Sequence, residues 1–147
     1  MATVLEQPTI EFFLLADRAE AINGKLYIMG GAWDRITVTE FSQPVSISLA
    51  LGVRIPWNAT NQQRALSVHL EHEDGTRIAP SIQANINAGR PADAIPGQSF
   101  LVIAAVNGQW TLPAAGTYRF VAALSEDEIK GATFHAVAAP GTKKPDS

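Results

Sequence analysis

Apolar and polar residues alternate at every second position along much of the chain, which is the pattern of a strand with one buried face. The clearest run is Val45–Ile55, where the odd positions are aliphatic and the even positions are serine, alanine, glycine or arginine. Prolines at positions 44 and 56 flank this run. Segments 66–71 and 116–124 alternate in the same way, so we expect each of the three to form a strand.

Asn23-Gly24 lies between two extended runs and predicts a two-residue hairpin turn, because both central residues of such a turn need a positive φ. This turn places Ile22 opposite Lys25. The glycine pair at 30–31 indicates a bulge or a close approach of two backbones. One face of the ribbon is then expected to be buried, and it carries Phe13, Leu15, Ala19, Ala21, Leu26 and Ile28.

Further turn signals divide the second half of the chain. Asp74-Gly75 predicts another hairpin. Pro80 interrupts the return strand, which places that strand at a sheet edge or bulge. Asn107-Gly108 fits either a turn or a strand that continues beyond it.

These patterns give about eight strands and no amphipathic helix. Many short strands separated by turn signals are typical of a sandwich or barrel. We therefore predict an all-β, antiparallel, two-sheet sandwich of immunoglobulin-like character. It forms a single domain over residues 1–138, followed by a polar, mobile tail at 139–147.

Composition removes several classes of function. The chain has 11 basic and 14 acidic residues, a net charge of −3, and no cysteine. Without a basic cluster, nucleic-acid binding is not expected, and disulfides and thiolate metal sites are excluded. The apolar run at 12–16 lacks the basic start of a signal peptide, and no run approaches a membrane span. We expect a cytoplasmic protein that does not contact a membrane.

Asp17 is the least expected residue of the first hairpin. Alternation places it on the apolar face, opposite Gly30. A buried carboxylate needs hydrogen bonds or a partner charge. Asp17 is therefore either a general base or metal ligand, or a buried structural carboxylate, and we favour the structural role because buried polar groups are usually bonded locally.

The segment His69–Asp74 gathers two histidines and three acids. On a strand, His69, Glu71 and Glu73 share one face and resemble part of a metal site. A solvated outer face beside a turn explains the same pattern, and we favour it. The chain has no Gly-x-Ser-x-Gly nucleophile motif and no phosphate-binding glycine loop, so we predict a non-enzyme without cofactor or bound metal.

The three tryptophans differ in their surroundings. Trp33 and Trp110 fit the core. Trp57 follows Pro56 in a polar loop, where it either stacks on a ligand such as a sugar or closes one end of the sandwich.

The run 100–106 is apolar at both odd and even positions, so it has a second apolar row besides the one that fills the core. No amphipathic helix is available to cover this row, and exposed apolar patches usually mark interfaces. We therefore expect a protein–protein surface and a homo-oligomer. The alternative is a small-ligand module that uses Trp57 and the 88–98 loop, and a metal-dependent enzyme ranks third. The expected interface residues are Leu101, Ile103, Ala105, Val121 and Ala123.

Two stretches resemble a family of small uncharacterised bacterial proteins, with similarity from about Ile10 to Val137. The resemblance implies a compact β-sandwich and no assigned activity. Separately, Gly116-x-Tyr118 looks like the tyrosine corner of immunoglobulin-like sandwiches. The matching residues are Leu15-Ala16-Asp17, Ala19, Gly24-Lys25-Leu26, Gly30-Gly31, Leu112-Pro113, Gly116, Tyr118, Phe120 and Val137.

Overall fold

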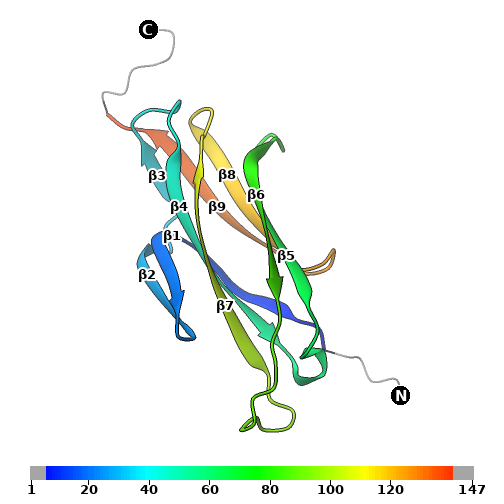
Figure 1. The fold of residues 1–147 in the computed structure, drawn as a ribbon. Helices are drawn as coiled ribbons and strands as arrows, with labels where there is room; N and C mark the ends of the chain where they lie inside the picture. The colour runs from blue at the N-terminus through cyan, green and yellow to red at the C-terminus, as the bar shows by residue number, and fades with distance from the viewer. Residues whose placement is uncertain (1–5, 141–147) are drawn as a thin grey trace.

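The computed structural model describes residues 6–140, which form a two-sheet β-sandwich (Figure 1). One sheet has four strands in the order β2-β1-β4-β7, and the other has five in the order β3-β9-β8-β5-β6. The strands are β1 (Thr9–Ile22), β2 (Lys25–Gly31), β3 (Arg35–Val38), β4 (Val45–Ile55), β5 (Arg64–His72), β6 (Arg77–Ile86), β7 (Phe100–Trp110), β8 (Gly116–Ala123) and β9 (Ile129–Ala138). The predicted all-β sandwich is confirmed.

The core lies between the two sheets and follows the alternation seen in the sequence. The aliphatic residues of β4 from Ile47 to Ile55 are buried in this core, as are Leu66, Val68 and Leu70 of β5. Aromatic rings fill its centre, where Phe120 packs edge-on against Trp110 at 4.9 Å between ring centroids. The largest fully buried side chains include Trp110, Tyr118, Phe120 and Phe134. Trp33 is partly buried and packs against the core.

The structure refines the predicted sandwich in two details. The described residues contain nine strands where about eight were predicted, because the short strand β3 gave no pattern of its own. β3 also pairs with β9 in parallel, so the sandwich is not wholly antiparallel. A strand of four residues with only Ile36 and Val38 turned inward is too short to show a periodic pattern.

The chain stays in the β3–β9 ladder beyond the predicted domain boundary at residue 138. The backbone N–H of Ala139 donates to the carbonyl of Val38 at 2.9 Å, so Ala139 belongs to the sandwich rather than to a tail. Residues 141–147 of the expected mobile tail lie outside the described residues.

The remaining turns agree with the sequence signals. The hairpin around Asp74-Gly75 joins β5 to β6, and β6 with its Pro80 is an edge strand. At Asn107-Gly108 the strand continues, and β7 ends only at Trp110. The Tyr118 hydroxyl donates to the Ala114 carbonyl at 2.6 Å, as in a tyrosine corner. Burial raises the pKa of this hydroxyl.

The first hairpin forms as predicted. Asn23 and Gly24 have φ of 52° and 75°, as the two-residue turn requires. The register places Ile22 opposite Lys25 and Ala19 opposite Ile28.

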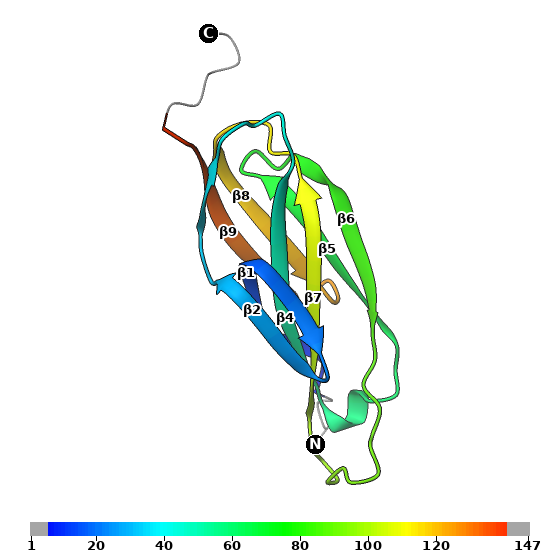
Figure 2. The same ribbon diagram turned by 60° about the vertical axis from the view of Figure 1, so that its left-hand side comes forward.

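The hairpin does not bury one continuous face, however. β1 pairs with β4 only as far as Ala16, and beyond it the hairpin folds over the outer side of the four-stranded sheet, in front of β4 and β7 in Figure 2. Phe13 and Leu15 reach the main core, whereas Ala19 and Leu26 join a small second cluster. Ala21 and Ile28 are exposed. The second cluster consists of Ala16, Ala19 and Ala50, with Leu14, Leu26 and Ala105 packed against it.

Polar side chains of β4 and β7 fix the hairpin over the sheet. The side-chain amide of Asn107 donates to the Ala19 carbonyl at 2.9 Å and accepts from the Ala19 N–H at 3.5 Å. The buried Ser48 hydroxyl bonds to Asn107 and lies 3.3 Å from the Asp17 carbonyl. These groups replace the ladder bonds that β1 loses when it leaves β4.

Among the described residues, no helix is long and apolar enough to cross a membrane.

Candidate functional site

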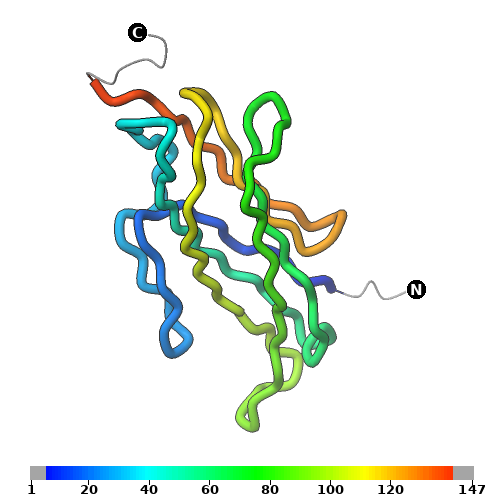
Figure 3. The backbone as a smooth tube through the Cα atoms, turned by 45° about the horizontal axis from the view of Figure 1, so that its top comes forward, coloured from blue at the N-terminus to red at the C-terminus, as the bar shows by residue number. Residues whose placement is uncertain are grey.

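Large apolar side chains are exposed along the outer part of the first hairpin. The exposed fractions are 55% for Tyr27, 37% for Ile28, 70% for Met29 and 45% for Ile22. We call these four residues the hairpin surface. Three of them lie on β2, which is an edge strand of the four-stranded sheet. In Figure 3 this hairpin extends beside the body of the sandwich, with its turn away from the other strands.

Asp17 and Gly30 set the position of β2 against β1. Gly30 has a φ of +60°, and a Cβ on it would lie 2.3 Å from Oδ2 of Asp17. The close contact at Gly30 is therefore with the Asp17 side chain rather than with a second backbone. The expected burial of Asp17 is wrong, because its side chain is exposed. The bend after Ala16 removes residue 17 from the row that faces the core.

The outer row of β7 has the orientation that the alternation predicted. Val102, Ala104 and Val106 pack against the main core, so the odd-numbered residues between them face outward. Ala105 is covered by the second cluster, and Ile103 is partly buried. Leu101 remains 40% exposed. The first hairpin therefore covers part of the outer row of β7, for which the sequence offered no amphipathic helix.

Val121 and Ala123 lie on the outer face of the five-stranded sheet, on the other side of the sandwich from Leu101. They pair in register with His69 and Ser67 of β5, respectively. Val121 is only 7% exposed. The five expected interface residues therefore do not form one continuous surface.

Trp57 lies in a short 3₁₀ turn, Trp57–Ala59, between β4 and β5. Its ring stacks on Phe100 at 6.4 Å, and the guanidinium of Arg90 lies 3.9 Å from the ring centroid. Arg90 also donates to the Trp57 carbonyl at 2.6 Å and to the Thr60 hydroxyl at 2.7 Å. Phe100 of β7 and Arg90 of the 88–98 loop therefore pack against the Trp57 ring at this end of the sandwich.

The side chains of the His69–Asp74 segment do not converge on one point. His69 bonds to Glu71 at 3.1 Å on the outer face of the sheet. His72 packs edge-on against Tyr118 and lies 3.2 Å from Asp74. The backbone N–H of Thr76 lowers the pKa of the Asp74 carboxyl. Within residues 6–140, no group of three or more His, Asp or Glu side chains could hold a metal ion.

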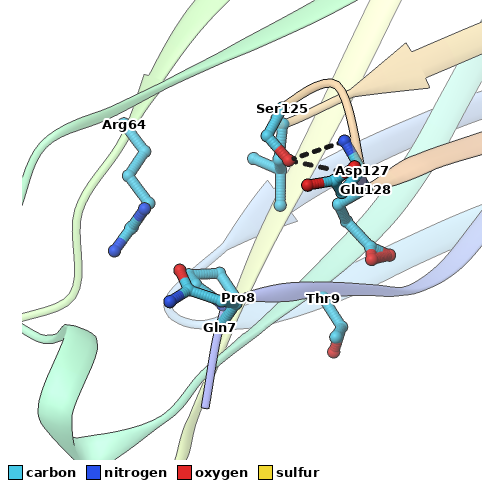
Figure 4. A pocket seen from close by; sticks show the side chains of 8 residues that line it. Gln7, Pro8, Thr9, Arg64, Ser125, Asp127 and Glu128 are labelled. Atoms are coloured by element: carbon cyan, nitrogen blue, oxygen red, sulfur yellow. Dashed lines mark hydrogen bonds between the residues drawn. The ribbon is translucent and has the colours of Figure 1, made fainter. Parts of the chain in front are cut away.

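A cavity of about 420 Å³, which the sequence did not indicate, lies between the start of β1 and the β8–β9 turn (Figure 4). Arg64 borders one side, and Ser125, Asp127 and Glu128 border the other. Ser125 Oγ accepts the N–H groups of residues 127 and 128, at 3.3 and 3.1 Å. Glu128 accepts the N–H of Ile10 at 3.2 Å. Ser125 therefore closes the turn, and Glu128 links the turn to β1.

The exposure of Tyr27 and Met29 on an open edge is not evident from the sequence. Alternation places them between Arg18, Glu20 and Lys25 on the outward face, where single apolar residues are common. One signal was available: the segment 26–31 contains neither a charge nor a proline, the two devices that usually protect an edge strand.

A comparison with curated proteins finds no match for this sequence. The model of a family of unknown function (DUF6941) matches residues 11–137, which include all of β2 to β8 and most of β1 and β9. The match covers most of the chain and both sheets. The chain therefore belongs to this family of unknown function, DUF6941.

Proposed function

We propose that the chain is a non-enzymatic protein-binding sandwich that associates with itself through the hairpin surface. The observation that carries this proposal is the exposure of three successive large apolar residues, Tyr27, Ile28 and Met29, on the two faces of one edge strand. Exposed apolar side chains on an edge strand are costly in water, and the open edge is available for pairing. We also propose that the protein is bacterial and cytoplasmic, as expected from the sequence.

The two edge strands of the five-stranded sheet support this choice by contrast. β3 has four residues and carries Arg35, and β6 carries Arg77 and Pro80. Short length, charge and proline are the usual protections against edge-to-edge contact. β2 has only Lys25, at its first position.

The two alternative functions have less support. A ligand that stacks on Trp57 would compete with Phe100 and Arg90 for the indole ring. A metal-dependent enzyme would need ligands to converge, and His69 and His72 are instead bonded to different acids. The self-association proposal uses side chains without comparable contacts to the rest of the sandwich.

Sedimentation velocity over a micromolar concentration series tests the proposal. We expect wild-type protein to form a dimer or larger assembly and Met29→Glu to sediment as a monomer, because the variant buries an unpaired charge at the contact. Ile129→Glu is the matched control, since Ile129 is 51% exposed on β9 of the other sheet. The hairpin surface is refuted as the contact if the wild type is monomeric, or if both variants lose self-association equally.

A further inference from the structure

We propose that two copies of the chain join edge to edge through β2, antiparallel, with Ile28 opposite Ile28 of the second copy. This inference rests on the proposed self-association and specifies its geometry. The two four-stranded sheets would then form one continuous sheet of eight strands across the contact. In the described part of the chain, no strand pairs with the outer side of β2.

The hairpin register determines which backbone groups of β2 face outward. In a two-residue hairpin the residues that flank the turn form a hydrogen-bonded pair, here Ile22 and Lys25. Hydrogen-bonded and non-hydrogen-bonded pairs then alternate along the ladder. Tyr27 and Met29 therefore direct their N–H and C=O groups to β1, as Lys25 does. Leu26 and Ile28 direct theirs to the free edge.

These outward groups match themselves under a two-fold axis at Ile28. Ile28 then exchanges two hydrogen bonds with Ile28 of the second copy. The same register brings Leu26 opposite Gly30, whose φ of +60° marks the end of the extended part of this edge. An interface between identical surfaces must be self-complementary in this way.

The side chains fit the same register. Tyr27 lies opposite Met29 of the second copy, and the reverse pair repeats across the axis. Thioether–aromatic contacts are favourable, and cross-strand pairs that include an aromatic ring stabilise sheets. Lys25, the one charged residue of β2, lies opposite Gly31 rather than opposite another lysine. No like charges oppose each other on β2.

β7, the other edge of the four-stranded sheet, contains no charged residue but is less available to a second chain. Trp110, at its end, donates from Nε1 to the Pro80 carbonyl of β6 at 3.0 Å, so the five-stranded sheet approaches β7 there. Most side chains of β7 are partly buried, whereas every residue of β2 except Leu26 is exposed. β2 is therefore the more exposed of the two edges of the four-stranded sheet.

Cysteine cross-linking tests this register, because the natural chain contains no cysteine. In Ile28→Cys the two Cα atoms would lie about 5.5 Å apart across the axis, within the range that a disulfide spans. We expect oxidation to give a covalent dimer on the order of a hundredfold faster than chance encounter at micromolar concentration, since paired strands act at millimolar effective concentration.

Tyr27→Cys and Met29→Cys are the matched controls for the register. Each of these positions would lie diagonally from its own copy, at about 7–8 Å, at or beyond the limit for a disulfide. Ile129→Cys measures cross-linking by chance encounter at an exposed position of the other sheet. We expect all three variants to cross-link slowly.

The outcomes separate this inference from the proposed function. Suppose that wild-type protein dimerises and Met29→Glu dissociates the dimer, but Ile28→Cys cross-links no faster than Tyr27→Cys. This result overturns edge pairing and leaves the hairpin surface as the contact. A wild-type monomer overturns both. Rapid cross-linking of Ile28→Cys alone supports the antiparallel register.

Discussion

β2 and β7 are the two edges of the four-stranded sheet, and their sequences look similarly apolar. β7 contains no charged residue, and β2 contains only Lys25. Their surroundings differ greatly. One row of β7 packs against the main core, and Ala105 of its other row is covered by the hairpin. On β2 only Leu26 is partly buried, and Met29 is 70% exposed.

The difference follows from where each strand lies relative to the second sheet. β7 pairs along its whole length with β4, an interior strand and the most buried one of its sheet. β2 pairs only with the part of β1 that has left β4 after Ala16. How far an apolar strand is buried therefore depends on its neighbouring strands and not on its composition alone. β7 contributes to the stability of one chain, and β2 is the edge that we propose contacts a second copy.

The largest expected effect is at the buried end of β7. Trp110→Ala should lower the free energy of unfolding by about 3–5 kcal/mol, because it opens a cavity beside Phe120 and removes the bond to Pro80. Urea denaturation of dilute protein measures this change. A loss below about 1 kcal/mol would contradict the view of β7 as a core strand.

A smaller loss is expected at the hairpin turn. Gly24→Val should cost about 1–3 kcal/mol, because a β-branched residue does not tolerate a φ of +75°. Gly24 has open space around it, so the cost would arise from the backbone alone. Gly89→Val is the control, since its surroundings are also open and no positive φ is required there. Equal effects in the two variants would argue against a strained turn.

The attachment of the hairpin to β7 is expected to contribute less. Asn107→Ala removes two hydrogen bonds to the backbone of Ala19 and should cost about 1 kcal/mol. Hydrogen exchange at residues 17–31 should accelerate more than exchange in the core strands. Gln109→Ala changes the next outward position of β7, which bonds only to Ser46 at 3.4 Å, and serves as the control. Unchanged exchange in Asn107→Ala would mean that the hairpin is held by its apolar cluster alone.

The smallest effect on the isolated chain is expected at the exposed positions. Tyr27→Ser and Leu101→Ser should each change monomer stability by less than about 0.5 kcal/mol, because both side chains are exposed. Only Tyr27→Ser should weaken self-association. Light scattering at matched concentrations distinguishes the two variants. If Leu101→Ser but not Tyr27→Ser dissociated the assembly, the contact would lie on the outer row of β7 rather than on β2.

Much of the fold could be predicted from local patterns. The alternation of Val45–Ile55 defined a strand with the same bounds, and Asn23-Gly24 defined the register of the first hairpin. The corner bond of Tyr118 also followed from a short motif. In each case neighbouring residues determine the geometry, so no knowledge of distant contacts is needed.

The rest depends on contacts between distant segments. Where β1 departs from β4 after Ala16, its backbone bonds to Ser48 and Asn107, which lie far along the chain. That departure exposes Asp17 and divides the apolar face of the hairpin. For the same reason alternation alone could not show that Tyr27 and Met29 would lie on an open edge.

Amide hydrogen exchange along β2, measured by NMR at low and high protein concentration, tests the central claim most directly. The account predicts that the outward-facing amides of Leu26 and Ile28 become protected as concentration rises, because they gain partners in the second copy. The amides of Tyr27 and Met29, which face β1, should be protected at both concentrations. Exchange at Leu26 and Ile28 that stays fast and independent of concentration would contradict pairing through β2.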